Sequence, residues 1–373
     1  MKGRLSLYKL SILQKLEVVT DQLIDLKRPE NENDYRLMGK EGEKVGYFAR
    51  DFGMGEWDWP QGVGLFGLDK LQHYYNDKRY EEYFIKWMNK QVENGLPTRN
   101  INTTVPLLTL MDIEGNEDFC KEWMTWLINE LPRTEEKGFQ HVTTGENKTE
   151  VKLNEGEIWL DTIFMTVLFS AKMGVKHDEK KWRDESIYQL LTHIKYLYDK
   201  KTNLFYHGWN YNNRDNFSEA FWCRGNSWFT LGLPEYLIIM KDYLDKGVYD
   251  YLLSTYQAQV NALIDYQASN GLWHTLLDDK DSYTEVSGTA AITAGILKGI
   301  RLGFLSKEKN FPVCLRAIDT ILQKISNDGT VQGVSGGTPI GEKKEDYKNI
   351  IIAPMAYGQA LTMILLTESL YHI

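Results

Sequence analysis

One stretch of the chain, GEIWLDTIFMTVLFSAKMGVKHDEKKWRDESIYQLLTHIKYLYDK (156–200), contains both kinds of helix that decide the fold. Apolar side chains recur there with the 3.6-residue period of an α-helix, and the pattern is interrupted only between Gly174 and Asp178. The segment before this break is almost free of charge, whereas the segment after it is rich in Lys, Asp and Glu. The stretch therefore predicts a tight helical hairpin that pairs a buried inner helix with an exposed outer helix.

The same helical period recurs along the whole chain, in twelve segments. We expect these helices over residues 5–26, 61–76, 78–94, 103–114, 117–131, 156–174, 179–200, 225–242, 247–270, 286–303, 307–327 and 352–371. Links from even to odd helices are very short, whereas several links from odd to even helices are long, at 27–60, 132–155, 201–224 and 328–351. Six such hairpins can close into a ring of inner and outer helices. We therefore predict an all-α fold, an (α/α)6 barrel in which residues 1–373 form one catalytic domain. An open α-solenoid is disfavoured because no repeat consensus is visible.

Composition excludes several classes of protein. The 373 residues carry a net charge of −9 and no Lys- or Arg-rich run, which argues against binding to nucleic acid or to an anionic membrane. Three widely spaced cysteines do not suggest a disulfide framework or a zinc site, and no cofactor is expected. The longest apolar run, 162–171, is too short to span a membrane, and the N-terminus lacks the apolar core of a signal peptide. We expect a soluble, cytoplasmic monomer.

Each even-numbered helix begins in an unusual polar or glycine-rich sequence, and long loops lead into several of them. These six sequences are GEWDWPQG (55–62), NINTTVP (100–106), NEGEIWLD (154–161), FWCRGNSW (221–228), TEVSGT (284–289) and IIAPMAYG (351–358). In a closed ring the six helix N-termini converge on one end of the central cavity, where their dipoles favour an anion. Aromatic residues make up 13% of the chain and recur in these motifs, as expected for either a large core or a sugar-binding cleft.

Two charged residues in these motifs are candidates for chemistry. Asp161 lies among apolar neighbours, so burial is expected to raise its pKa and to suit it as a general acid. It could instead be a buried carboxylate that caps a neighbouring loop. Arg224 stands at a helix start, where a cation opposes the helix dipole, so we expect it to face an acidic partner. That partner could be a ligand carboxylate or an acidic residue of the protein.

Polar residues on the loops complete the candidate site. His141 and His207 precede two of the inner helices, and their spacing fits no familiar metal motif, so hydrogen bonding to sugar hydroxyls is favoured over metal binding. Ordinary loop histidines remain an alternative. Asp58 begins the second helix beside two tryptophans, whereas Thr103 and Thr104 are better explained as helix caps.

Taken together, these motifs resemble those of the unsaturated glucuronyl and rhamnogalacturonyl hydrolases of glycoside hydrolase family 105, which is related to family 88. The resemblance covers nearly the whole chain. It is carried by WDWPQGVGLFGL, NINTTVPLLTL, GEIWLDTIFM, LFYHGW, FWCRGNSW, EVSGTA and the late VSGGTP run. The order and spacing of these pieces is more specific than any one of them, and the resemblance implies the same (α/α)6 barrel.

The resemblance also implies a reaction. Such enzymes act on oligosaccharides whose non-reducing end carries a 4,5-unsaturated uronic acid, and they hydrate its C4=C5 double bond. An Asp protonates C4, water adds at C5, and the hemiketal opens and expels the neighbouring sugar. The family's acid/base Asp falls on Asp161. Its substrate-binding positions fall on Trp59, His141, His207, Trp222, Arg224 and Trp228. The implied partner is therefore an unsaturated, uronic acid-containing oligosaccharide, and the sequence does not specify the sugar next to the uronate.

One departure from the family pattern concerns a second carboxylate. Relatives carry an Asp where this chain has Asn102, and an amide cannot act as a base. Asn102 could hold a hydroxyl or orient Asp161, or Asp58 or Glu157 could supply the second carboxylate.

Three other functions remain open. An ordinary inverting glycosidase would use Asp58 and Asp161 as carboxyls about 6.5–9.5 Å apart. A sugar epimerase would use His141 and His207, and a non-catalytic carbohydrate-binding protein would need no acid at all.

Overall fold

The computed structural model describes residues 2–26, 52–145 and 147–373 of the chain. Most of the expected link 27–60 thus lies outside the described residues.

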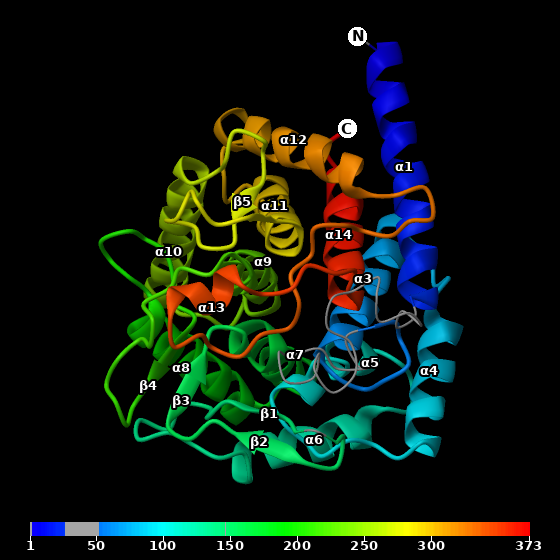
Figure 1. Ribbon diagram of the computed structural model, residues 1–373. Coiled ribbons are helices and arrows are strands. Elements are labelled where there is room, and N and C mark those ends of the chain that lie inside the picture. The colour runs from blue at the N-terminus through cyan, green and yellow to red at the C-terminus, as the bar shows by residue number, and fades with distance from the viewer. Residues whose placement is uncertain (1, 27–51, 146) are drawn as a thin grey trace.

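A closed ring of inner helices forms the centre of the molecule (Figure 1). In chain order these helices are α3 (Trp59–Tyr75), α5 (Leu107–Leu110), α7 (Leu168–Lys176), α9 (Cys223–Ile239), α11 (Val286–Arg301) and α14 (Ala356–Ser369). Each helix packs against the next, and α14 returns to α3. Small residues allow the closest approach: a Cβ on Gly295 of α11 would lie 2.2 Å from the Thr230 carbonyl oxygen of α9.

An outer layer of amphipathic helices covers this ring. It consists of α1 (Lys2–Asp25), α4 (Glu81–Glu93), α6 (Glu117–Asn129), α8 (Lys180–Leu197), α10 (Lys246–Asp265) and α12 (Lys307–Lys324). The quoted hairpin is formed by α7 and α8, which pack together as predicted. Helix α1 packs on α14, so the first and last long helices form the sixth pair. The predicted all-α (α/α)6 barrel is confirmed.

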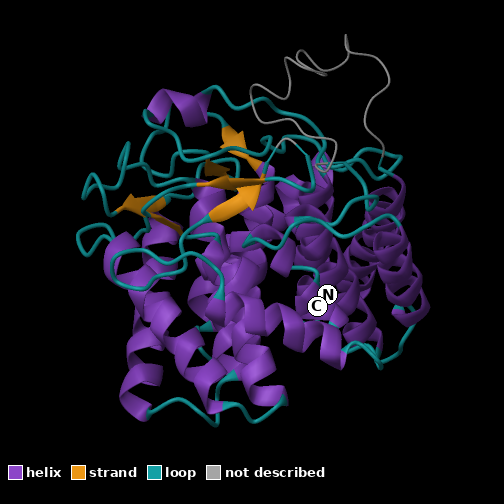
Figure 2. Ribbon diagram, turned by 90° about the horizontal axis from the view of Figure 1, so that it is seen from below, coloured by secondary structure: helices purple, strands orange, loops and turns teal. Residues whose placement is uncertain are grey.

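Among the described residues, three two-stranded antiparallel sheets lie in the long connections. They pair β1 (Val142–Thr144) with β2 (Val151–Leu153), β3 (Glu157–Trp159) with β4 (Gly208–Asn210), and β5 (Trp273–His274) with β6 (Thr284–Glu285). Figure 2 shows these strands and the long loops gathered at one end of the helical body. The short helix α13 (Lys344–Lys348) belongs to the last of these loops. We call this end of the ring the loop end.

Two expected helices differ from the prediction. The helix expected over 103–114 is a 3-10 turn, η2 (Asn102–Thr104), followed by the single turn of α5. The hydroxyls of Thr103 and Thr104 both hydrogen-bond to the Asn100 carbonyl, an arrangement that competes with regular helix. The helix expected over 156–174 starts later, because residues 157–159 form strand β3. A π-helical turn, η3 (Ile163–Val167), then leads into α7.

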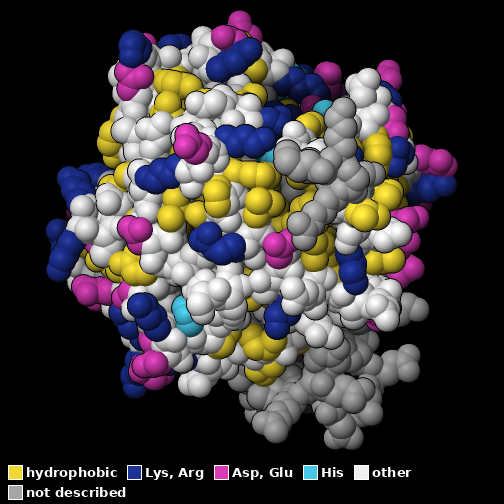
Figure 3. Space-filling view, turned by 90° about the horizontal axis from the view of Figure 1, so that it is seen from above, with side chains coloured by type: hydrophobic (Ala, Val, Ile, Leu, Met, Phe, Trp, Pro, Cys, Tyr) yellow, Lys and Arg dark blue, Asp and Glu magenta, His cyan; other side chains and the backbone are white. Residues whose placement is uncertain are grey.

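No helix within the described ranges is long and apolar enough to cross a membrane. On the face shown in Figure 3, acidic and basic side chains are interspersed among apolar ones.

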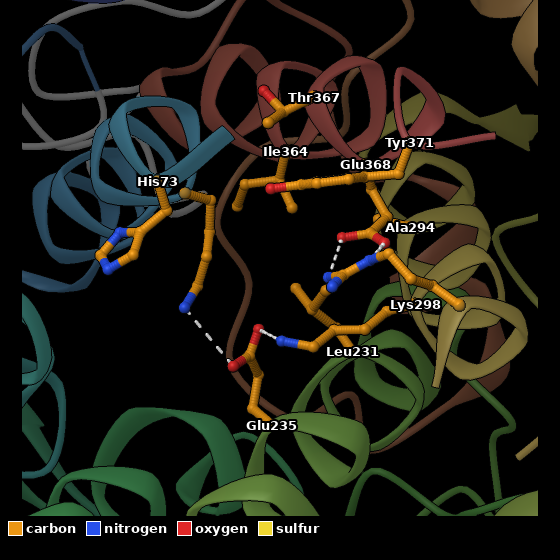
Figure 4. A pocket seen from close by; sticks show the side chains of 11 residues that line it. His73, Leu231, Glu235, Ala294, Lys298, Ile364, Thr367, Glu368 and Tyr371 are labelled. Atoms are coloured by element: carbon orange, nitrogen blue, oxygen red, sulfur yellow. Dashed lines mark hydrogen bonds and ion pairs between the residues drawn. The ribbon is translucent and has the colours of Figure 1, made fainter. Parts of the chain in front are cut away.

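The end of the ring opposite the loops holds a polar cavity of about 310 Å³ between the C-terminal ends of α3, α9, α11 and α14 (Figure 4). Glu235 is ion-paired with Lys298 and, at 3.4 Å, with Lys70. Arg301 donates two hydrogen bonds to Glu368, at 2.5 and 2.9 Å. Cations are favourable at helix C-termini, and here each is paired with a carboxylate. These side chains therefore satisfy one another and close the base of the ring.

Candidate active site

A short strand pair at the loop end brings Asp161 beside His207. In the register of β3 and β4, Trp159 lies opposite Gly208, and the Leu160 amide donates to the His207 carbonyl at 2.9 Å. Asp161 follows directly, in the turn before η3 rather than one turn into a helix as the sequence suggested. Its Oδ2 lies 3.3 Å from Nε2 of His207. The Asp161 side chain is 18% exposed and that of His207 only 2%, so the carboxyl faces outward over a buried imidazole.

His141 packs on the opposite side of the same aromatic wall. Its ring stacks on Trp159 with centroids 4.0 Å apart, and Trp159 meets the His207 ring edge-on at 5.4 Å. Nδ1 of His141 lies 3.1 Å from the hydroxyl of Thr162, the residue after Asp161. Trp159 thus separates the two histidines and fixes both rings in relation to the carboxyl. The structure brings these predicted site residues together.

Buried polar atoms around Asp161 have few partners among the described residues. Oδ2 of Asp161 and Nε2 of His207 face each other at 3.3 Å and have no other partner, and Nε1 of Trp222 has none. The Trp222 ring lies against His207, with centroids 4.4 Å apart. Leaving a buried donor or acceptor unpaired costs about 1–3 kcal/mol, so such groups usually need an explanation. A polar ligand that supplies the missing hydrogen bonds would explain them.

The pKa of Asp161 differs from the prediction. Burial does raise it, as expected, but the hydrogen bond from His207, together with a further contribution from His141, brings the pKa below its ordinary value. The prediction of a raised pKa was therefore wrong, because no local pattern indicated that a histidine would face the carboxyl. Burial also lowers the pKa of His141 to about 3. This imidazole is neutral near pH 7, where it can hydrogen-bond to hydroxyls but is a poor proton acceptor.

Arg224 is buried and donates to the protein itself. Its Nη1 donates to the carbonyl and hydroxyl of Ser335, at 2.8 and 2.6 Å, and Nη2 donates to the Gly336 carbonyl at 2.7 Å. The carboxylate of Glu285, which is fully buried, lies 3.9 Å from Nη1. Of the two partners that the sequence left open, this geometry favours an acidic residue of the protein. Arg224 anchors the glycine-rich VSGG loop at the loop end of the ring.

Trp59 and Trp228 meet beside the first turn of α3. Trp59 stacks on Tyr357 with centroids 4.4 Å apart and meets Trp228 edge-on at 6.0 Å. Trp59 is partly exposed, whereas Trp228 is 1% exposed and packs on Phe164. Trp59 can therefore offer a ring face to a ligand. Trp228 lies behind it, which places this residue in the core in the present structure.

Asp58 has a clear structural task. It caps the N-terminus of α3, where one carboxylate oxygen accepts a hydrogen bond from the Trp59 amide at 2.7 Å. The other oxygen accepts from the Thr144 hydroxyl at 2.6 Å. Both oxygens are thus used within the protein, and the geometry favours a cap over a catalytic base.

Asn102 and Glu157 lie on neighbouring elements. The half-buried Asn102 begins η2, which packs against η3 just after Asp161. Glu157 accepts a hydrogen bond from Nε1 of Trp159 at 2.7 Å, and burial raises its pKa. It therefore supports the aromatic wall rather than extending into the site. Within the described ranges, no cluster of three or more His, Cys, Asp or Glu residues is suited to hold a metal ion.

The sequence model of Glycosyl Hydrolase Family 88 matches residues 37–372. The chain belongs to this family. It is 29% identical to the unsaturated rhamnogalacturonyl hydrolase YesR of Bacillus subtilis over 330 residues, which cover 87% of this chain and 91% of the relative. The family and this relative identify the chain as an enzyme, a glycosidase.

Solved structures agree with this assignment. A possible member of the GH105 family from Salmonella enterica is 34% identical, with a TM-score of 0.87 over 97% of this chain and 94% of the other. A possible GH105 member from Klebsiella pneumoniae is 35% identical, with a TM-score of 0.86 over 97% of this chain and 93% of the other. The family resemblance inferred from the motifs is thus confirmed.

The family 88 fold also places one residue in the site that the motifs did not reveal. Tyr347 of α13 is 1% exposed, and its hydroxyl lies 2.7 Å from Nδ1 of His207. The two residues are 140 positions apart in the chain. Tyr347 lies in a loop with no helical period and outside all quoted motifs. In the sequence, the one sign of its role is that Tyr347 is an aromatic residue between charged neighbours in a long loop.

Proposed function

We propose that this glycosidase removes the 4,5-unsaturated uronic acid from the non-reducing end of oligosaccharides that polysaccharide lyases generate. The observation that carries the proposal is the Asp161 carboxyl held 3.3 Å from His207, at the loop end of the barrel. Unpaired polar atoms and aromatic rings surround it, as a sugar site requires. The name of the Bacillus subtilis relative supports the same class of substrate.

In this proposal Asp161 delivers a proton to C4 of the unsaturated ring, and water adds at C5. The hemiketal that results opens and releases the neighbouring sugar. Protonation at C4 builds positive charge at C5, which a nearby carboxylate stabilises once Asp161 has lost its proton. The same carboxylate can then accept a proton from the attacking water, so that one residue serves as acid and base.

The surrounding residues bind and orient the sugar. Trp59 offers an exposed ring face, and His141, His207 and Trp222 offer hydrogen-bonding groups beside Asp161. Asn102 is proposed to hold a hydroxyl, since its amide cannot exchange a proton. Arg224 contributes by fixing the VSGG loop, and the N-terminal end of α9 favours the uronate carboxylate. A monomer in the cytoplasm remains our prediction for the state and location of the enzyme.

The test uses unsaturated disaccharides prepared with rhamnogalacturonan, ulvan and glycosaminoglycan lyases. Hydration removes the conjugated double bond, so activity is read as a loss of its ultraviolet absorbance. We expect the wild-type enzyme to consume at least one of these substrates, and Asp161→Asn to lower kcat by about 10³-fold, within the range for loss of a general acid. Asp118→Asn, which changes a carboxyl that is 97% exposed on α6, is the matched control.

Two results would contradict the proposal. One is hydrolysis of saturated glycosides with no activity on any unsaturated disaccharide, which would point to an ordinary glycosidase. The other is a fully active, correctly folded Asp161→Asn enzyme, which would remove this carboxyl from the reaction.

A further inference from the structure

Tyr347 occupies a position that controls the proton state of the imidazole facing Asp161. The Gly341 amide donates a hydrogen bond to the Tyr347 hydroxyl at 3.1 Å. That hydroxyl lies 2.7 Å from Nδ1 of His207, whose Nε2 is directed at Asp161. A phenol has one proton to donate. With its oxygen already accepting from Gly341, its own proton is available for Nδ1.

A histidine that accepts a hydrogen bond at one ring nitrogen carries its proton on the other. We propose that Tyr347 is a positioning residue: it donates to Nδ1 of His207 and thereby holds the imidazole in the neutral Nε2–H form, with this proton facing the Asp161 carboxylate. The proposal rests on the proposed function only for its catalytic consequence. The hydrogen bonds themselves are a property of the protein without substrate.

The loop that carries Tyr347 is held firmly in place. Lys344 and Lys348 of α13 pair with Asp278 and Asp279, at 3.1 and 2.8 Å. The Tyr283 hydroxyl donates to the Tyr347 carbonyl at 3.2 Å. These contacts fasten α13 to the turn that precedes β6. The phenol is therefore presented to His207 from a fixed support.

The same loop is also held in place at Gly341, whose amide donates to the Tyr347 hydroxyl. The Ser218 hydroxyl donates to the Gly341 carbonyl at 2.8 Å, so the residue whose amide bonds to Tyr347 is tied to the loop before α9. The ring of Tyr347 also packs against Trp222, with centroids 5.8 Å apart. A residue of a late loop thus orients a histidine contributed by a much earlier loop. Neither residue could hold this geometry alone.

The direct test is nitrogen NMR of the protein labelled with ¹⁵N-histidine, without substrate. Two-bond ¹H–¹⁵N correlations show which ring nitrogen of each histidine carries the proton, and the His207 signals are assigned by their absence from His207→Gln. We expect a neutral Nε2–H imidazole at neutral pH in the wild-type protein. In Tyr347→Phe we expect this preference to be lost, with the proton shared between the two nitrogens.

The matched control is Tyr256→Phe. Tyr256 of α10 is also fully buried, and its hydroxyl donates a hydrogen bond to the Gly295 carbonyl of α11 at 2.7 Å. Neither residue belongs to the loop that carries His207. This variant loses a similar hydrogen bond but should leave the His207 signals unchanged. In turnover, Tyr347→Phe should lower kcat about 10- to 100-fold and change KM less than threefold, whereas Tyr256→Phe should change neither.

The outcomes separate this inference from the proposed function. An Nδ1–H or doubly protonated His207 in the wild-type protein would overturn the inference, and so would unchanged His207 signals in Tyr347→Phe. If no unsaturated disaccharide is consumed, the proposed function fails, while the NMR result still decides the role of Tyr347.

Discussion

Replacing Glu235 by Gln removes the central carboxylate of the ion-pair network at the base of the ring. Burial raises the pKa of Glu235, but the charges of Lys298 and Lys70 outweigh this and bring the pKa from 4.5 to about 2. Because the pKa is lowered in the folded protein, the ionised carboxylate stabilises the fold above pH ~4.5, and this stabilisation is lost as the pH falls towards 2. A difference of about 2.5 pKa units, at about 1.4 kcal/mol each, gives roughly 3 kcal/mol of unfolding free energy at pH 7.

Urea unfolding followed by circular dichroism measures this effect, because urea leaves ion pairs unscreened. Glu235→Gln should be less stable than the wild-type protein by roughly 3 kcal/mol at pH 7 and by only about 1.5 kcal/mol at pH 3, where part of the contribution is already lost. Glu82→Gln, which changes a carboxylate that is 79% exposed, is the control and should cause no measurable change. An equal loss at both pH values would refute the electrostatic reasoning, and so would no loss at pH 7.

Three further predictions follow from single contacts. Arg224→Met should lower the unfolding free energy by about 3–5 kcal/mol, since it leaves Glu285 buried without its cation; a loss below 1 kcal/mol would show that the pair is dispensable. Asp58→Asn retains a capping oxygen and should keep kcat within about threefold, whereas a 100-fold loss with an unchanged Tm would restore Asp58 as a second catalytic carboxyl. Gly295→Ala should lower Tm by several degrees, because its methyl group would collide with the Thr230 carbonyl; an unchanged Tm would mean that α9 and α11 can separate at little cost.

The barrel could be predicted because its signals are local. Helical period and the alternation of short and long links are properties of neighbouring residues, and they located the long inner and outer helices to within a few positions. The prediction failed where a partner distant in sequence decides the conformation. Residues 157–159 become a strand because β4, about fifty positions later, supplies the ladder. No local pattern could have shown this pairing, and the helix was therefore expected to start too early.

The candidate site was predictable in the same way: residues on local motifs were found, whereas partners distant in sequence were not. Asp161 was expected near the start of an inner helix, and His141 and His207 on long loops that lead into inner helices, so the converging ends of a closed ring were expected to bring them together. Tyr347 was missed because its role depends on a fold of the late loop that carries no period or motif. The partner of Arg224 was left open for the same reason. The sequence predicted an acidic partner for this guanidinium, either on a ligand or in the protein. Only the packed loops show that Glu285 lies 3.9 Å away and that the Ser335 and Gly336 carbonyls accept its hydrogen bonds.

The lowered pKa of Asp161 also bears on which sugars such a site can process. Burial alone raises the pKa of this carboxyl, but the hydrogen bond from His207 brings it below its ordinary value and favours the carboxylate. A second negative charge close to Asp161 would raise its pKa again, since like charges disfavour the ionised form. A uronate brings that charge with it. The acid form of Asp161 would then become populated when an acidic sugar enters, and a neutral sugar of the same shape would leave the carboxyl ionised and unable to protonate the ring.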